Sequence, residues 1–520
     1  MASPPEPAPV TLDYKDGRTI AERTPSRIRS TADAEEKRAL HGLNGRADDA
    51  RNDKDDNDGD DTAGEPTSDD QASRTPSPEF KEGGYGWVVV FAVFILNMHT
   101  WGMNSSYAVF LAYYLKSGHF PGASDIAFAF VGGLSISIAF LVSPLATASI
   151  GRYGTRITLL VGIFFETVAF VGASFTSQMW HLLLSQGVAF GIGMGFIFVG
   201  SVGIVPQWFT RRRSFANSLS TAGSGFGGLT YSLATNAMIK NIGLAWAFRV
   251  LAIVACVANL VSVLLVRDRN RSVGAVHVAF HWTLFRRPEY LLLLVWAWFI
   301  ILGYVVVVFS LPAYAQAAGH VTAAQGSLVG ALFNLSQGVG RPLIGLLSDP
   351  VGRLNVSALG TLGAGLAALF LWVFAGPHYA GLVVYSLLGG LAGILWATVA
   401  PVTAEIVGIP LLPSALSILW LVLALPSTFA EVIGLSLRTK GASPYLHVQL
   451  FCGLCYVGAF MSAWLLRAWK LHQLDDLHLT QEQEAAEVRD GAAYAPSDAQ
   501  RTSFGQYLLK GEWVFKARRV

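Results

Sequence analysis

From residue 82 to about residue 470 the chain is an almost continuous series of apolar segments, each roughly 20 residues long. A helix of that length rises about 30 Å, which matches the hydrocarbon core of a bilayer. In lipid every backbone group must be bonded within the protein, and a helix achieves this whereas an open strand does not. The sequence therefore predicts an all-α polytopic membrane protein with twelve transmembrane helices. The segments are centred near Leu96, Ala139, Phe165, Gly193, Gly225, Val257, Phe299, Leu335, Leu366, Gly390, Leu423 and Gly458.

The composition excludes several other classes of protein. Charged residues make up 14% of the chain, against about 25% in soluble domains. The formal net charge is only +2 and most charges lie in the tails, so we predict no nucleic-acid partner. Cys256, Cys452 and Cys455 lie in apolar segments, and we interpret them as packing residues rather than as a metal site. No phosphate-binding G-x-x-x-x-G-K-[ST] loop is present, so we expect neither direct ATP drive nor a cofactor.

A polar stretch from Arg267 to Glu289 divides the apolar segments into two sets of six. We therefore predict an N-terminal six-helix bundle at residues 82–266, a linker at 267–289 and a C-terminal six-helix bundle at 290–470. Residues 1–81 are polar and include an acidic run, which predicts a disordered tail. Residues 471–520 form a second tail.

Loop arginines predict the orientation, because cytoplasmic loops are enriched in Lys and Arg. One set of loops holds eleven such residues and the opposite set holds four, so we expect both tails, the linker and the arginine-rich loops to be cytoplasmic. We expect the plasma membrane as location, with the vacuolar membrane as an alternative. The eleven are Arg152, Arg156, Arg211, Arg212, Arg213, Arg267, Arg269, Arg271, Arg286, Arg287 and Arg353; the four are Lys116, Lys240, Arg438 and Lys440.

Two loops, about 200 residues apart, repeat one pattern. Gly151–Arg156 follows the second apolar segment, and Gly345–Arg353 follows the eighth. Both resemble the loop signature of the major facilitator superfamily, G-x-x-x-D-R-x-G-R in outline. The resemblance implies that Asp349 and Arg353, with Arg152 and Arg156 in the first copy, latch helices in one of two alternating states. The first copy has Gly151 in place of the acidic residue.

Two further motifs stand at the start of the first and of the fifth apolar segment. One is an acidic-Gly-Gly-aromatic-Gly-Trp hexapeptide, and the other is an aromatic pair followed by a basic triplet and small residues. Together they resemble the signatures of the monocarboxylate porter family, and the stretch Asn97–Tyr107 is similar to its fungal branch. The resemblance implies a transporter of two six-helix bundles that works by alternating access. The signature residues are Glu82, Gly83, Gly84, Tyr85, Gly86, Trp87, Arg211, Arg212 and Arg213.

Polar residues on two apolar segments predict a substrate site. Asn97, Trp101 and Asn104 share one face of the first segment, and Asn334, Gln337 and Arg341 share one face of the eighth. For a single Asn, a hydrogen bond between helices is the commoner explanation. An intramembrane arginine needs an anion and grips a carboxylate with two hydrogen bonds, although near Pro342 and a helix end it could also extend to the interface. We predict a small, anionic substrate at Arg341.

The resemblance also predicts differences in ion coupling. Animal monocarboxylate porters carry an Asp where this chain has Gln337 and a Lys where it has Ser105, and both charges are linked to proton coupling. Glu166 and Glu431 are the remaining carboxylates inside apolar segments. Each could carry a proton or pair with a cation of a helix or loop. The sequence predicts a secondary active or facilitative transporter of small organic acids or carboxylate-bearing metabolites, with export from the cell as one possible direction. Alternatives are proton-coupled monocarboxylate or vitamin uptake and a non-transporting nutrient sensor. No catalytic constellation is readable, so we expect no enzyme.

Overall fold

The computed structural model describes residues 13–15, 18–20, 82–117, 120, 125–317, 322–375, 378–439, 441, 443–490 and positions 504, 507, 508, 511–514, 516, 518 and 520. It divides into two units, Met1–Lys81 and Glu82–Val520. In the first unit, β1 (Asp13–Lys15) and β2 (Arg18–Ile20) pair antiparallel with Asp13 opposite Ile20. The predicted disorder of residues 1–81 otherwise concerns positions outside the described residues.

The first half of the second unit forms six helical rods, several of them broken. The first rod contains three helices, the second is bent by 41°, and the fourth contains a π-helical turn. The elements are α2 (Tyr85–His99), α3 (Trp101–Ser105) and α4 (Tyr107–Ser117); α5 (Asp125–Leu141) and α6 (Ser143–Tyr153); α7 (Thr155–Ala173); α8 (Met179–Leu182), η1 (Leu183–Ala189), α9 (Phe190–Val202) and η2 (Val205–Gln207); α10 (Arg213–Ile242); and α11 (Leu244–Leu265).

The second half follows a linker that contains the short helix η3 (Trp282–Arg286) and forms six more rods. The elements are α12 (Pro288–Ala317); α13 (Ala323–Val351); α14 (Arg353–Leu366), η4 (Ala367–Trp372) and α15 (Val373–Ala375); α16 (Tyr379–Leu387), α17 (Gly389–Ala392) and α18 (Ile394–Val407); α19 (Leu412–Ser436); and α20 (Leu446–Asp490), with η6 (Glu512–Val514) beyond it. All twelve predicted segment centres lie in these rods, so the predicted all-α fold is confirmed.

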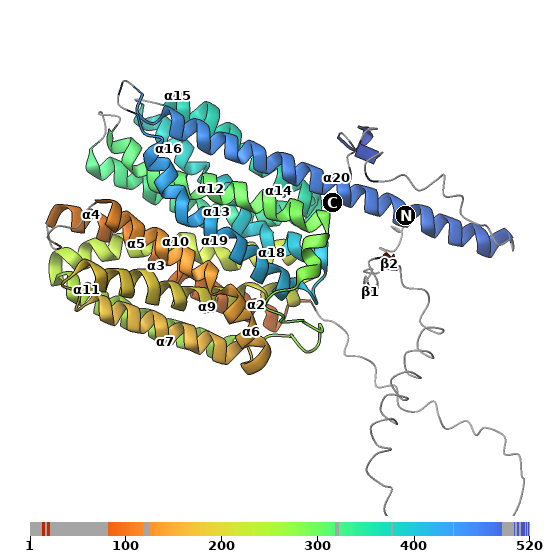
Figure 1. The fold of residues 1–520 in the computed structure, drawn as a ribbon, viewed down its shortest axis with the longest axis horizontal. Helices are drawn as coiled ribbons and strands as arrows, with labels where there is room; N and C mark the ends of the chain where they lie inside the picture. The colour runs from red at the N-terminus through yellow and green to blue at the C-terminus, as the bar shows by residue number, and fades with distance from the viewer. Residues whose placement is uncertain are drawn as a thin grey trace, which may run out of the picture. The chain divides into compact units, whose positions relative to one another are not determined.

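Figure 1 shows the halves as two layers, α2 to α11 in warm colours and α12 to α20 in green to blue. Within the described part of the second unit, nine helices are long and apolar enough to span a membrane, and the bent pair α5–α6 makes ten. The two rods below that threshold, α10 and α13, pack against each other between the bundles. Because protein rather than lipid covers much of their surface, they can be rich in Gly, Ser and other small or polar residues.

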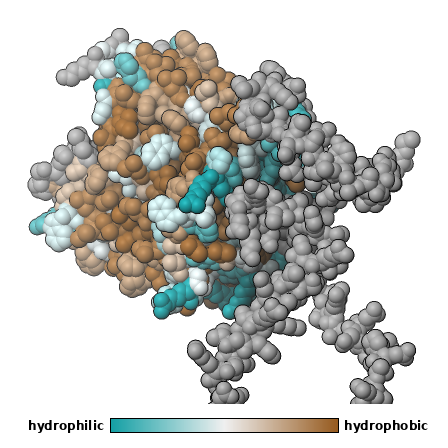
Figure 2. All heavy atoms as spheres, turned by 45° about the vertical axis from the view of Figure 1, so that its right-hand side comes forward, coloured by the Kyte–Doolittle hydropathy of each residue, from teal (hydrophilic) through white to brown (hydrophobic). Residues whose placement is uncertain are grey.

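The outer surface of the rods is apolar, as lipid contact requires. Leu264 and Phe374 are about three-quarters exposed, and Phe91, Phe164 and Met461 are more than half exposed. Figure 2 shows apolar side chains over much of the face it presents. Exposed apolar surface of this extent is unsuited to water and matches a lipid-facing belt.

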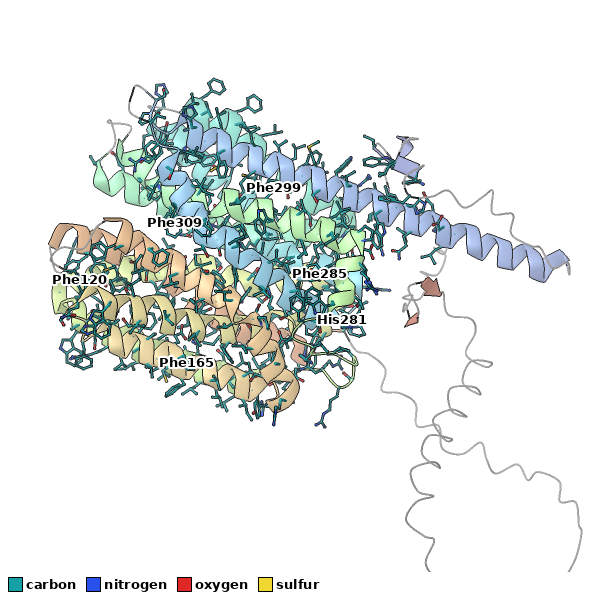
Figure 3. All side chains as sticks on the ribbon, in the orientation of Figure 1. Phe120, Phe165, His281, Phe285, Phe299 and Phe309 are labelled. Atoms are coloured by element: carbon teal, nitrogen blue, oxygen red, sulfur yellow. The ribbon has the colours of Figure 1, made fainter. Side chains whose placement is uncertain are left out.

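The two ends of the helix assembly carry different charged residues. The latch end carries Glu82, Arg213, Asp349 and Arg353, and the opposite end carries Lys240. In Figure 3, Phe120 marks the opposite end, His281 and Phe285 mark the latch end, and Phe309 lies between the two layers. Toward the latch end the bundles touch closely, because a methyl group added at Gly225 of α10 would lie 2.4 Å from the Gly338 nitrogen of α13.

Candidate functional site

A cavity of about 830 Å³ lies between the bundles. Residues of α2, α3, α4 and α10 line one side, and residues of α12, α13 and α18 line the other. Along α10 the wall runs from Thr221 to Lys240, a rise of about 28 Å, so the cavity extends from mid-helix to the opposite end. All six residues predicted for the substrate site contribute to the wall: Asn97, Trp101, Asn104, Asn334, Gln337 and Arg341.

Arg341 forms the inner end of this cavity and is only 4% exposed. Its Nη1 donates to the Thr221 carbonyl at 2.8 Å and to Ser224 Oγ at 2.5 Å, and its Nη2 donates to Gln337 Oε1 at 2.5 Å. The first two partners belong to the other bundle, so the guanidinium joins α13 to α10. It lies buried among neutral acceptors rather than reaching toward the helix end at Pro342. Its Nε has no partner among the described residues.

Neighbouring wall residues are held by contacts within and between helices. Asn97 Nδ2 donates to the Ser220 carbonyl at 3.2 Å, and Asn104 Oδ1 accepts from Ser135 Oγ at 2.9 Å. Asn97 is therefore both a link between α2 and α10 and part of the wall. The Trp101 ring lies 5.0 Å from that of Trp396 across the bundles, and its buried Nε1 has no partner among the described residues. The wall thus holds two unsatisfied donors, on Trp101 and Arg341.

The electrostatic character of the wall is positive. Arg341 and Lys240 contribute to it, and no Asp or Glu does so among the described residues. Ser105 and Gln337, the two positions where animal porters carry charges, also lie in this wall. Glu166 does not: it accepts from Asn259 Nδ2 at 2.7 Å, between α7 and α11. Glu431 of α19 is likewise absent from the described lining.

Asp349 and Arg353 come together at the latch end. The Asp349 carboxylate accepts from the backbone nitrogens of Ser214 and Phe215, both at 3.0 Å, and so caps the first turn of α10. Arg353 donates to the Thr210 carbonyl at 2.9 Å and pairs with Glu405 at 2.8 Å. This group, which we call the latch, therefore ties the start of α10 to α13, α14 and α18.

The first copy of the loop pattern is built differently. Arg156 donates to the Val266 carbonyl at 3.4 Å, and Arg152 lies over the neighbouring Tyr153 ring, so neither side chain joins the latch. A methyl group added at Gly151 would lie 3.1 Å from Cβ of His277, so the linker packs closely where an acidic side chain would otherwise stand. The linker then bonds to the second bundle, where Val276 donates to the Pro410 carbonyl at 2.8 Å. No sequence motif indicates this role for the linker.

The two family signatures pack against each other. The Glu82 carboxylate accepts from the backbone nitrogens of Arg211 and Arg212 at 3.1 and 2.8 Å. The Trp87 ring lies 4.8 Å from that of Phe209. Gly86 allows a close approach, because a methyl group there would lie 3.1 Å from Cβ of Trp208, a tight contact. Glu82 to Trp87 and the basic triplet are therefore one structural unit at the latch end.

Sequence reasoning missed several residues of the cavity and latch. Thr221 and Ser224 bind Arg341, Tyr304 donates to Gln337 at 2.9 Å, and Glu405 pairs with Arg353. The sequence does contain one indication of the first pair: Thr221 and Ser224 are three residues apart, so their hydroxyl groups share a face of α10. The distant partners gave no signal of their own.

Comparisons with known proteins place this architecture in context. The family model described as Major Facilitator Superfamily matches residues 89–430. The chain is 33% identical over 407 residues to the uncharacterized transporter ESBP6 of Saccharomyces cerevisiae, covering 75% of this chain and 60% of that protein. The probable transporter MCH2 of the same yeast is 30% identical over 400 residues, which cover 76% of this chain and 84% of that protein. The chain thus spans less than two thirds of the length of the first relative.

A solved structure supports the fold. The proton:xylose symporter XylE, bound to 6-bromo-6-deoxy-D-glucose, superposes with a TM-score of 0.60 at 14% sequence identity. The match covers 73% of this chain and 95% of that protein. At this identity the likeness concerns the arrangement of helices alone.

Proposed function

Because the chain belongs to the major facilitator superfamily and is a membrane transporter of that type, we propose that it carries small organic acids or larger carboxylate-bearing metabolites by alternating access. The observation behind this proposal is the setting of Arg341. Its charge is buried in the cavity wall, its hydrogen-bond partners Thr221, Ser224 and Gln337 are neutral, and the described wall holds no acidic residue. A bound carboxylate would supply the missing counter-charge.

Arg341 also suggests how binding and opening are linked. A carboxylate that takes both Nη atoms of Arg341 would compete with Gln337 for Nη2, and for Nη1 with Thr221 and Ser224. Those two residues belong to the opposite bundle, so substrate binding would weaken a contact that holds α10 to α13. Asn97, Asn104 and Asn334 would contact the rest of the substrate, with Trp101 and Trp396 covering its apolar part. A ligand that binds the two states differently shifts their populations.

The loop arginines supply the proposed orientation. With the latch end in the cytoplasm, both tails and the linker are cytoplasmic, and the cavity of this structure faces outward. Asp349 and Arg353 then hold the cytoplasmic side closed. We place the protein in the plasma membrane, with the vacuolar membrane as the alternative.

Uncharged Ser105 and Gln337 favour facilitated transport or export over proton-driven monocarboxylate uptake. The resemblance links proton coupling to charges at these two positions, and both line the cavity here. Transport in proteoliposomes with and without an imposed pH gradient separates the two. Accumulation that follows the gradient would establish proton coupling instead.

The site is tested by Arg341→Ala in proteoliposomes supplied with labelled organic acids. We expect transport to fall by at least about tenfold, because charge-assisted hydrogen bonds contribute about 1.5–3 kcal/mol. Arg249→Ala is the matched control: it removes a cation that packs on Phe175 and Trp246 and is absent from the described lining. Full activity of the Arg341 variant would disprove the site. Substrate binding without flux in the wild type would indicate a nutrient sensor.

A further inference from the structure

The described residues between 504 and 520, called the segment below, lie against the latch end of the second bundle, at α14 and α20. Its described residues include two buried apolar side chains, Trp513 at 9% and Val520 at 7% exposure. Phe504 and Tyr507 place their rings 5.9 and 5.0 Å from the imidazole of His472 on α20. The segment therefore has apolar anchors as well as the polar contacts that follow.

Arg467 of α20 is the first polar anchor. It is 4% exposed, and it donates to the Trp513 carbonyl at 3.0 Å, to the Lys516 carbonyl and to Asn355 Oδ1 at 2.6 Å. Two of these three acceptors are backbone atoms of the segment. Without the segment, a buried guanidinium would lose most of its hydrogen bonds, which is costly. Arg467 therefore depends on this segment for two of its three hydrogen bonds.

Asp475 is the second anchor, two turns further along α20. Its carboxylate pairs with Lys516 at 2.6 Å and with Arg518 at 2.8 Å, and it accepts from the Tyr507 hydroxyl at 3.2 Å. One acidic side chain thus gathers two cations of the segment. These pairs are partly exposed, so salt will weaken them.

The third anchor is the first turn of α14. The Val520 carbonyl accepts from the backbone nitrogens of Leu354 and Asn355 at 2.9 and 3.3 Å, where a helix lacks internal partners. Gly352 adopts φ +115°, and a methyl group added there would lie 2.4 Å from the Val520 oxygen. Only glycine therefore allows this approach.

The segment and the latch contact neighbouring residues of the chain, Gly352 and Arg353. Gly352, which leaves room for Val520, directly precedes Arg353, which holds Thr210 and Glu405. We propose that residues 504–520 act as an intramolecular clamp. When docked between α14 and α20, the clamp orders the start of α14 and favours the closed latch; when released, it favours opening. The proposal does not depend on the identity of the substrate.

The test measures exposure of the latch directly. Ser348 is fully buried and donates to Ser214 at 3.3 Å, so Ser348→Cys, with Cys256, Cys452 and Cys455 replaced by alanine, reports opening through its labelling rate with N-ethylmaleimide. In the full chain in liposomes, we expect Asp475→Asn to raise that rate about three- to tenfold, as loss of two partly exposed pairs predicts.

Three comparisons decide the outcome. Deleting residues 501–520 should raise labelling at least as much, and adding Asp475→Asn to the deletion should change nothing further. Asp268→Asn, which removes an exposed charge at the same end, should label like the wild type. Unchanged labelling in both Asp475→Asn and the deletion would overturn the proposal. Arg518→Gln provides the same test if the deletion does not fold.

A membrane surface is the competing occupant for a basic segment. If the segment docks on the protein rather than on lipid, the labelling rate of the wild type should be equal in liposomes of phosphatidylcholine alone and in liposomes that also contain phosphatidylserine. High salt should raise labelling more in the wild type than in the deletion, because only the wild type has the Asp475 pairs in addition to those of the latch. A rate that depends on phosphatidylserine in the wild type and not in the deletion would show that the segment binds lipid, contrary to the clamp.

Discussion

At the scale of single residues, the pair Glu166–Asn259 makes a clear prediction. Both side chains are buried, Asn259 Nδ2 donates to Glu166 Oε2 at 2.7 Å, and neither Glu166 Oε1 nor Asn259 Oδ1 has a partner among the described residues. Glu166→Gln keeps the existing bond and adds an amide donor beside the unsatisfied Asn259 oxygen. We therefore expect its melting temperature in detergent to equal or exceed that of the wild type.

Asn259→Leu is the companion variant. It leaves a buried carboxyl without its donor, which costs about 1–3 kcal/mol, so the melting temperature should fall. A fall in Glu166→Gln as large as that in Asn259→Leu would show that the carboxyl itself is required. Loss of transport in a stable Glu166→Gln protein would return this residue to the list of proton carriers.

Residues of the cavity were predictable only in part. Helical spacing puts Asn334, Gln337 and Arg341 on one face, and the cost of burying an arginine in lipid indicates a site. The same reasoning cannot identify Thr221 or Ser224, because they lie about 120 residues away and meet Arg341 only when the bundles pack. Their own chemistry is ordinary for a helix, so the sequence gives them no special status.

At the scale of elements, two glycines of α10 should behave differently although they are two residues apart. A methyl group at Gly223 would lie 2.0 Å from the Phe94 oxygen of α2, within one bundle. A methyl group at Gly225 would lie 2.4 Å from the Gly338 nitrogen of α13, in the other bundle. Gly223→Ala therefore strains every state of the protein, whereas Gly225→Ala strains the state in which α10 and α13 are in contact.

We expect Gly223→Ala to lower the melting temperature, at a cost of about 1–3 kcal/mol. Gly225→Ala should instead increase thiol labelling of the Ser348→Cys reporter while losing less thermal stability. The two measurements, made on both variants, separate these roles. Equal losses of stability with no change in labelling would show that the α10–α13 contact is present in all states.

Element boundaries were the least predictable part of the fold. Hydropathy locates twelve segments of about 20 residues, yet α10 and α12 each contain 30 residues, and α20 contains 45. The breaks at Thr100 and Ser106 and the π-helical turns η1 and η4 also had no sequence signal. Helices extend beyond the apolar core wherever protein contacts cap them, and hydropathy does not record such contacts.

At the scale of the whole molecule, the two bundles are joined at the latch end by two different kinds of contact. One side uses the carboxylate and guanidinium of Asp349 and Arg353, and the other uses the linker packed at Gly151. The twelve-helix fold of two bundles and the family were predicted correctly from hydropathy and motifs. This asymmetry was not predicted, because the linker is held by hydrogen bonds from its backbone nitrogens to the Pro410 carbonyl and to Ser414 Oγ, and no motif records them.

The linker should respond to pH. Burial lowers the pKa of His277 from its ordinary value of 6.5, with smaller opposing effects from the Ala275 backbone and Asp268. A lowered pKa in the docked state means that docking is fully favoured above pH 6.5 and weakens as the pH falls below that value. We expect trypsin to cleave at Arg271 faster at pH 5.5 than at pH 7.5, after correction for the protease's own pH dependence.

His277→Gln should remove most of this difference while leaving cleavage at pH 7.5 near that of the wild type. A pH dependence that persists in the variant would assign the effect to another group.

The low hydropathy of α10 and α13 has a consequence for the assembly of the protein in the membrane. A helix enters lipid by itself only when its apolar side chains outweigh the polar ones. α10, with Asn217, Ser218, Ser220 and Thr221 in a single stretch, is poorly suited to that step. Its stable insertion therefore depends on α2, which it contacts through Gly223 and Gly227 and which is made first on the ribosome. Biogenesis of this transporter is thus cooperative among helices, and a substitution that loosens α2 from α10 would reduce the amount of protein in the membrane before it affects transport.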